Sequence, residues 1–141
     1  MRIFHSSGAV ASRPHGLEVG LDDGWRLRLH AMADDLLRVV LEPAEGLPVD
    51  RSWMIAPEGE VPWEGRPRDD MAGFAPPATT LERLDDGATR LVAGRFRVTV
   101  AASPLRLSVE QKVGDAWRPW ISDRGTGGFV RVDGDRKVRH Y

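Results

Sequence analysis

The stretch Thr89–Glu110 reads TRLVAGRFRVTVAASPLRLSVE and carries the clearest pattern in the chain. Before Ser103-Pro104, every second residue is apolar, so that Phe96, Val98 and Val100 share one face. After Ser103-Pro104, the run LRLSVE alternates in the same way. A period of two is typical of β-strands that bury one face, because successive side chains point to opposite sides of a sheet. The stretch therefore predicts a set of half-buried strands joined by short turns.

The same alternation continues outward in both directions. In the run Trp25–Ala31, the apolar residues Trp25, Leu27, Leu29 and Ala31 face one way, and the polar residues between them, Arg26, Arg28 and His30, face the other. Asp22-Asp23-Gly24 and Asp85-Asp86-Gly87 are hairpin signals, which favour antiparallel pairing because parallel strands need long crossovers. No long segment has helical periodicity, so the sequence predicts an all-β fold, a sandwich or a barrel. The further runs that we expect to be strands are 16–21, 36–43, 52–55, 79–84, 89–93, 117–121, 129–132 and 138–141.

Two regions depart from this pattern. Residues 1–15 contain serine, glycine and proline without clear periodicity, and we expect a loose N-terminal lead-in. Residues 16–141 then form a single β-sandwich domain that contains a long irregular loop at 56–78. That loop holds five prolines, and loops of this length in a compact domain are usually functional or mobile.

Composition excludes several classes of protein. The 141 residues include 20 basic and 21 acidic side chains, and the net charge of −1 argues against a nucleic-acid partner. The absence of cysteine excludes disulfides, thiolate metal sites and cysteine nucleophiles. The N-terminus has no apolar core of a secretory signal, and no stretch is apolar enough to span a membrane. We therefore expect a cytoplasmic protein with no membrane partner.

The order of the strand motifs resembles a known family. The motifs LLRVVLEP (Leu36–Pro43), SWMI (Ser52–Ile55) and Thr89–Glu110 are similar, in this order, to the N-terminal domain of glycoside hydrolase family 31, the α-glucosidase and α-xylosidase family. WISDRGTGGF (Trp120–Phe129) and VRHY (Val138–Tyr141) extend the similarity over roughly residues 16–141. No single motif is diagnostic, and the ordered series carries the resemblance.

The resemblance implies an antiparallel β-sandwich of the galactose-mutarotase-like supersandwich type, in part or in full. In the family this domain packs on a catalytic (β/α)8 barrel and helps to frame the substrate pocket of a retaining enzyme that needs no cofactor. The nucleophile and the acid/base aspartates of the family lie in that barrel. The chain reaches Tyr141 in what reads as the middle of a strand, so we expect the barrel to be absent from these residues and to belong to a longer parent polypeptide.

The carboxylates of this chain do not form a recognisable catalytic pair. A retaining glycosidase needs two carboxylates about 5–5.5 Å apart, whereas adjacent residues in a strand point to opposite faces. Most of the adjacent aspartates lie at expected turns, where aspartate bonds its own backbone. We leave open a ligand or domain contact only for Asp69-Asp70, in the long loop. The four adjacent pairs are Asp22-Asp23, Asp34-Asp35, Asp69-Asp70 and Asp85-Asp86.

The histidines, His5, His15, His30 and His140, lack the spacing of a metal site, and we expect them to be solvated or to lie at strand edges. A mutarotase-type reaction that uses histidine and glutamate would need a chain about twice as long. No catalytic, cofactor-binding or metal-binding residue is therefore assigned, and the substrate-binding residues stay unknown.

The tryptophans leave a second function open. Trp25 alternates with the apolar set and is expected in the core, whereas Trp117 and Trp120 should face opposite sides of their strand. Trp63 lies in the long loop. An exposed indole can stack on a sugar ring, so the alternative function is a free-standing carbohydrate-binding module. A third reading is a structural sandwich that associates with itself through an exposed edge strand.

Overall fold

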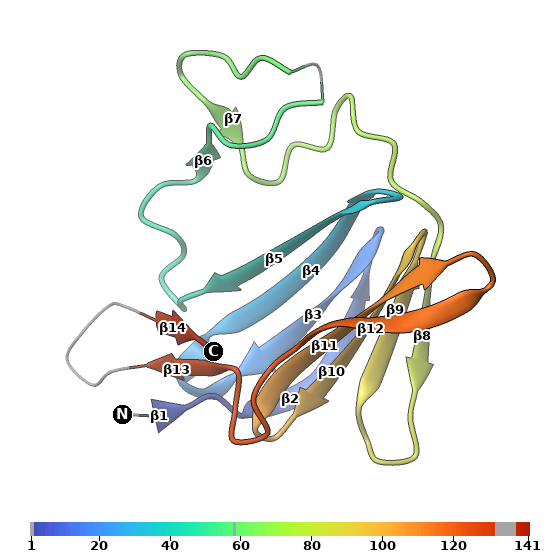
Figure 1. Cartoon of the computed structure of the whole chain (residues 1–141). Helices are drawn as coiled ribbons and strands as arrows, with labels where there is room; N and C mark the ends of the chain where they lie inside the picture. Colours follow the sequence, from blue (N-terminus) through green and yellow to red (C-terminus); the bar gives the residue numbers. More distant parts are fainter. Residues whose placement is uncertain (1, 58, 132–137) are drawn as a thin grey trace.

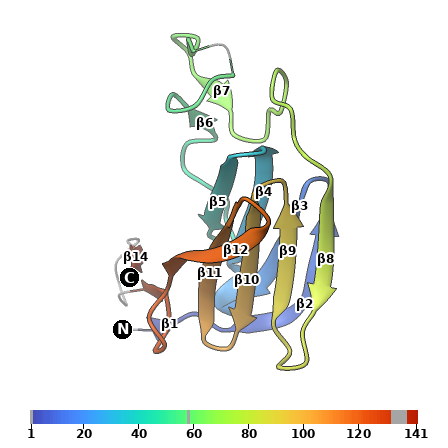
Figure 2. The same cartoon turned by 45° about the vertical axis from the view of Figure 1, so that its right-hand side comes forward.

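The computed structural model describes residues 2–57, 59–131 and 138–141. The fold is an antiparallel β-sandwich without an α-helix in these ranges, and Figures 1 and 2 show its two main sheets facing each other. The four-stranded sheet has the order β2-β3-β4-β5 and the five-stranded sheet has the order β12-β11-β10-β9-β8. All strand pairs in both sheets are antiparallel, as the hairpin signals predicted.

The strands of the four-stranded sheet are β2 (Ser6–Arg13), β3 (Gly16–Leu21), β4 (Arg26–Ala33) and β5 (Leu36–Glu42). The five-stranded sheet contains β8 (Thr79–Arg83), β9 (Thr89–Ala93), β10 (Phe96–Ala102), β11 (Leu105–Val113) and β12 (Ala116–Ser122). A small sheet of β1 (Arg2–Ile3), β13 (Phe129–Arg131) and β14 (Val138–His140) lies at one end of the sandwich (Figure 1). A 3-10 turn, η1 (Asp22–Gly24), joins β3 to β4.

The core lies between the inner faces of the two sheets. Leu17 and Leu29 from one sheet and Leu91 and Leu105 from the other are completely buried. Each fully buried leucine favours the folded state by about 1.5–3 kcal/mol relative to an exposed one. Alternation in the sequence therefore fixes which face of each strand enters the core. The core cluster consists of Phe4, Leu17, Val19, Leu21, Leu27, Leu29, Ala31, Leu91, Ala93, Val98, Val100, Leu105, Leu107 and Phe129.

The expectation of a loose lead-in over residues 1–15 is wrong. Residues Ser6–Arg13 form β2, which pairs with β3 along the edge of the four-stranded sheet. Most side chains of β2 are exposed, and of its residues only Val10 packs against the core. The strand is thus held by backbone hydrogen bonds and buries little, so its sequence carries no apolar period.

The long excursion between β5 and β8 is largely irregular, as its prolines predicted. Among its described residues, the only regular structure is a pair of antiparallel strands of two residues each, β6 (Arg51–Ser52) and β7 (Arg66–Pro67). Figures 1 and 2 show this excursion extending beyond the sandwich on the side of β4 and β5. The expected strand at 52–55 is reduced to its first residue, which lies in β6.

Gly16 marks the tightest approach between two strands. A Cβ atom at Gly16 would lie 1.9 Å from the carbonyl oxygen of Leu29 in β4, whereas a Cβ atom at Gly8 would meet nothing within 4 Å. Gly16 starts β3 and pairs with His30. The absence of a side chain at Gly16 therefore allows β3 and β4 to keep their register.

We predict that Gly16→Ala lowers the free energy of unfolding by about 1–3 kcal/mol, the usual cost of overpacking a tight contact. The matched variant Gly8→Ala should stay close to the wild-type value. Urea unfolding followed by tryptophan fluorescence measures both. Equal midpoints for the two variants would contradict the strand contact described above.

Candidate functional site

One side of the sandwich, between β5 and β12, leaves core-type side chains uncovered. Val39 of β5 is 46% exposed, Ile121 of β12 is 48% exposed and Trp120 is 58% exposed. We call this surface the open side and define it by Val39, Leu41, Val109, Trp120 and Ile121. In Figure 2 both β5 and β12 lie on the same side of the molecule. Large apolar patches of this kind usually mark surfaces that bind a partner or a ligand.

The open side follows from the difference in width between the sheets. Ile121 pairs with Val109 and belongs to the inner face of the five-stranded sheet. The ring of Trp120 stacks on the buried Phe96, with centroids 5.5 Å apart and planes 14° apart. The opposite sheet ends at β5. Among the residues that the structure describes, no strand of that sheet therefore lies beyond β5 to cover β12.

The two tryptophans of β12 face opposite sides, as predicted. Trp117 lies on the outer face, where the guanidinium of Arg97 sits 4.9 Å from its ring centroid. Arg97 also forms two hydrogen bonds of 2.6 Å to the carboxylate of Glu110, and these bonds lower the pKa of Glu110. This cluster stabilises the outer surface and is fully engaged, so it offers no free group for a ligand.

An acid–imidazole pair lies at one end of the open side. Asp123, whose side chain is 2% exposed, accepts a 2.6 Å hydrogen bond from the backbone N–H of Leu107. Its other carboxylate oxygen lies 2.7 Å from Nε2 of His140, and the imidazole stacks on Phe129 with ring centroids 4.4 Å apart. The pair borders a cavity of about 380 Å³ whose other walls are apolar. That cavity is lined by Val39, Leu41, Leu107, Val109, Ile121, Asp123, Phe129, Val138 and His140.

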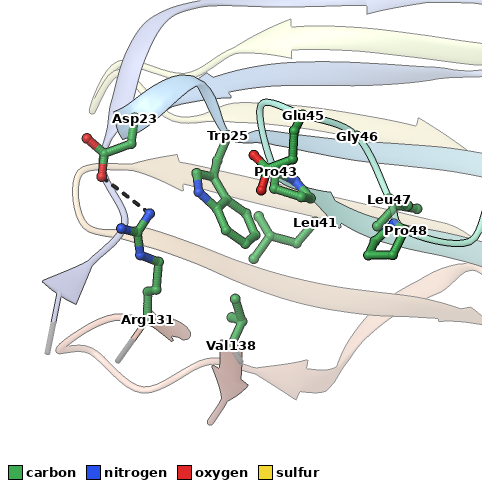
Figure 3. Close-up of a pocket in the computed structure, with 10 residues that line it drawn as sticks. All are labelled: Asp23, Trp25, Leu41, Pro43, Glu45, Gly46, Leu47, Pro48, Arg131 and Val138. Atoms are coloured by element: carbon green, nitrogen blue, oxygen red, sulfur yellow. Dashed lines mark ion pairs between the residues drawn. The ribbon is translucent and has the colours of Figure 1, made fainter. Parts of the chain in front are cut away.

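A larger cavity of about 720 Å³ adjoins this one, and the two share Leu41 and Val138. Figure 3 shows the indole of Trp25 lying between Leu41 and the ion pair of Asp23 with Arg131, whose nearest atoms are 3.4 Å apart. Trp25 also packs on Phe4. It was expected in the core, and it does pack against the core cluster, but it lies at the edge of that cluster and is only partly buried. The rest of the lining is Pro43, Glu45, Gly46, Leu47 and Pro48.

Charged residues tie the long excursion to the outer face of the four-stranded sheet. Arg28 of β4 forms 3.0 Å hydrogen bonds to both carboxylate oxygens of Asp69. Glu42 lies between two arginines, with one oxygen 2.7 Å from Arg26 and the other 2.7 Å from Arg28. Glu42 is buried, and its ion pairs with the two arginines offset the desolvation cost of burying its charge. The contact left open for Asp69 is thus a contact within this chain, which joins the long excursion to β4.

Arg38 and His30 lie beside this network on the same outer face. Arg38 donates to the backbone carbonyl of Arg68. Burial lowers the pKa of Arg38, the negative charge of Asp69 opposes this shift, and the positive charges of Arg68, Arg66 and Arg28 add to it. His30 lies on the polar face as predicted, yet it is half-buried rather than solvated. Burial lowers the pKa of His30, as do the charges of Arg28 and Arg38, while Asp69 and Glu18 oppose the shift.

The excursion exposes two tryptophans at its far end. Trp63 is 91% exposed, and its carbonyl accepts a 2.9 Å hydrogen bond from the indole N–H of Trp53. A shallow cavity of about 390 Å³ lies on the same excursion, and neither tryptophan belongs to its lining. Of its polar groups, Arg66 is bound to Asp70 and to the carbonyl of Ala72. Its lining is Arg51, Pro57, Glu60, Pro62, Glu64, Gly65, Arg66, Pro67, Asp70, Ala72 and Gly73.

The remaining predicted residues are dispersed. Asp34-Asp35 and Asp85-Asp86 lie in hairpin turns, as expected, and Asp22-Asp23 belong to the 3-10 turn. The ring of His5 is 3.1 Å from the hydroxyl of Ser103, and the ring of His15 is 3.2 Å from the carbonyl oxygen of Pro77. The structure therefore brings none of the four histidines together.

Sequence reasoning missed the burial of Glu42 and the pairing of Asp123 with His140. Glu42 could have been found, because it shares the outward face of its strand with Arg38 and pairs in register with Arg26. The pairing of Asp123 with His140 joins residues 17 positions apart, and no local pattern indicates it.

Within the described ranges, no group of three or more His, Cys, Asp or Glu side chains is placed to hold a metal ion. The described part of the chain also contains no helix with the length and hydropathy of a membrane span. Comparisons with protein-family models, curated proteins and solved structures found no match.

We predict that protonation of His30 destabilises the fold. Because its pKa is lower in the folded chain than the ordinary value of 6.5, the unfolded chain binds this proton more readily. The free energy of unfolding should therefore fall as the pH drops below about 6.5. His30→Gln should show a shallower fall in urea titrations between pH 7.5 and pH 5.5. His5→Gln, which also removes one imidazole, is the control, and a wild-type slope in His30→Gln would refute the prediction.

Proposed function

We propose that this chain is a non-catalytic β-sandwich domain of a retaining α-glucosidase-type glycoside hydrolase. In this role it packs on the catalytic (β/α)8 barrel of the parent polypeptide and helps to frame the substrate pocket. The observation that carries the proposal is the open side, where Val39, Trp120 and Ile121 expose apolar surface that belongs to a core. A domain that normally lies against another domain has such a surface.

The sequence resemblance supports the same role. The motif LLRVVLEP corresponds to β5 and Pro43, and Thr89–Glu110 corresponds to β9, β10 and most of β11. Two strands from these motifs, β5 and β11, line the cavity of the open side. The residues that carry the resemblance thus include those that form the proposed docking surface.

The chemistry of the described residues suits a supporting role. A retaining mechanism needs two carboxylates about 5–5.5 Å apart across the scissile bond. In the open-side cavity the ionisable groups of the lining are Asp123 and His140, and they bind each other. Glu42 and Asp69 are engaged by arginines. These carboxylates act as structural acceptors, which fits a domain that leaves catalysis to another one.

The second candidate is a carbohydrate-binding module, and the exposure of Trp63 favours it. The indole of Trp63 is 91% exposed, and an exposed indole can stack on a sugar ring. The two roles differ in which surface they use, because the tryptophans of the excursion lie apart from the open side.

We predict that the isolated chain releases no nitrophenol from p-nitrophenyl α-glucoside. The structural reason is that Asp123 and His140 are paired to each other rather than to an open substrate position. Asp123→Asn is the control that reports on the one acid–base pair in the open-side cavity. Release that co-purifies with the wild-type chain and disappears in Asp123→Asn would contradict a non-catalytic role.

The reading frame beyond the Tyr141 codon gives the most direct test of the parent. We predict that it encodes a (β/α)8 barrel with the two catalytic aspartates of the family. A stop codon immediately after Tyr141 would refute the proposed parent polypeptide.

Calorimetric titration with linear glucans separates the two roles. We predict no heat of binding for a packing domain. Measurable binding that is lost in Trp63→Ala and kept in Trp120→Ala would instead establish the carbohydrate-binding module.

A further inference from the structure

Over Leu37–Glu42, the edge of β5 carries neither a bulge nor a proline. Among the described outer strands, β2 has a register shift between Ser6 and Val10, and β12 combines a register shift with Pro119. The short strand β8 carries Glu82 and Arg83. Bulges, prolines and charges are the usual devices that prevent an edge strand from pairing with another chain. Over Leu37–Glu42 the strand β5 has no register shift against β4 and no proline, and its inward side chains, Leu37, Val39 and Leu41, are all aliphatic. Its two charged residues, Arg38 and Glu42, both lie on the outer face of the sheet.

An additional strand beside β5 would also complete the core. The five-stranded sheet extends one strand further than its partner, and that strand, β12, carries the exposed Ile121. Strands in a sheet lie about 4.8 Å apart, so a strand next to β5 would lie opposite β12. Its inward side chains would then cover Val39 and Ile121. The same added strand would therefore pair with the backbone groups at the edge of β5 and bury the exposed apolar side chains.

The outward face of β5 indicates the charge of the incoming strand. Arg38 lies in the middle of this face and bonds a backbone carbonyl, while the carboxylates nearby are held by Arg26, Arg28 and Arg66. An acidic side chain on the neighbouring strand would pair with Arg38 across the strands. An incoming basic side chain would add to an existing excess of positive charge.

We propose that the edge of β5 binds an extended partner segment in which apolar side chains alternate with acidic ones, so that the segment becomes the fifth strand of the four-stranded sheet. This inference builds on the proposed function, since it names the kind of partner element that the open side takes. The apolar side chains cover Val39 and Ile121, and the acidic side chains face Arg38. Main-chain hydrogen bonds supply affinity and the alternating side chains supply specificity, as in other cases of strand addition.

The test uses a capped peptide of alternating valine and glutamate that matches the seven residues of β5. A capped peptide of alternating valine and lysine is its control. Binding is measured by anisotropy of the labelled peptides, and hydrogen exchange reports the protection of the β5 amides. We expect the glutamate peptide to bind more tightly and to protect β5. In Arg38→Glu the preference between the two peptides should shift by about fivefold toward lysine, which is the size of a cross-strand charge pair.

A matched pair of variants tests the apolar face. Ile121→Asp should weaken both peptides, whereas Val113→Asp should not, because Val113 is similarly exposed at 49% but lies at the end of β11 next to the hairpin turn. Light scattering of the chain alone is measured first. A dimer with protected β5 amides would make a second copy the occupant and overturn the proposal. Binding of neither peptide, or equal binding of both in wild type and in Arg38→Glu, would also overturn it.

These results are independent of the tests of the parent enzyme. A stop codon after Tyr141 would refute the glycosidase parent and leave strand addition intact. Failure of the peptides would refute strand addition and leave the reading frame unchanged.

Discussion

Two sheets that share one core must cover each other, and here a four-stranded sheet faces a five-stranded one. The inner faces of β3 and β4 are fully matched by β9, β10 and β11, so their leucines are completely buried. At β12 the match ends, and Trp120 and Ile121 remain half exposed. The open side, the cavity beside it and the unpaired edge of β5 all follow from this difference in width. The apolar side chains there cost solvation free energy unless another element covers them.

Electrostatics explains why the long excursion is ordered near the sheet. Arg28 connects Glu42 of the sheet to Asp69 of the excursion, and each of the three groups is an ion-pair partner of another. Removing Arg28 would leave the buried Glu42 with one arginine and would remove the arginine that hydrogen-bonds both carboxylate oxygens of Asp69. A buried charge without its partner is costly, so the network favours a single placement of the chain around Asp69. The side chain of Trp63 is far less constrained by packing, since it is 91% exposed and the residue contributes its backbone carbonyl to the indole of Trp53.

The alternation in Thr89–Glu110 and Trp25–Ala31 was sufficient to predict the inner faces of the sandwich, because burial imposes a period of two. It could not predict β2, whose residues are mostly exposed and which is held mainly by backbone pairing with β3. The solvated state expected for His30 was wrong for a related reason: alternation places a residue on a face but does not show that an excursion packs on that face. The pairing of Asp123 with His140 joins residues that lie 17 positions apart in the sequence, and sequence spacing contains no information on it.

The polar end of the open side bears on what can cover it. A buried ionisable group opposes burial unless its hydrogen bonds are already made. Asp123 has both carboxylate oxygens engaged, one by the N–H of Leu107 and one by the ring of His140. A partner that closes the cavity therefore need not supply a charge at that end. The requirement for a charge lies on the outer face instead, at Arg38. The surface thus favours an element that is apolar toward the core and acidic toward solvent, which is the pattern of a single amphipathic strand rather than of a uniformly apolar one.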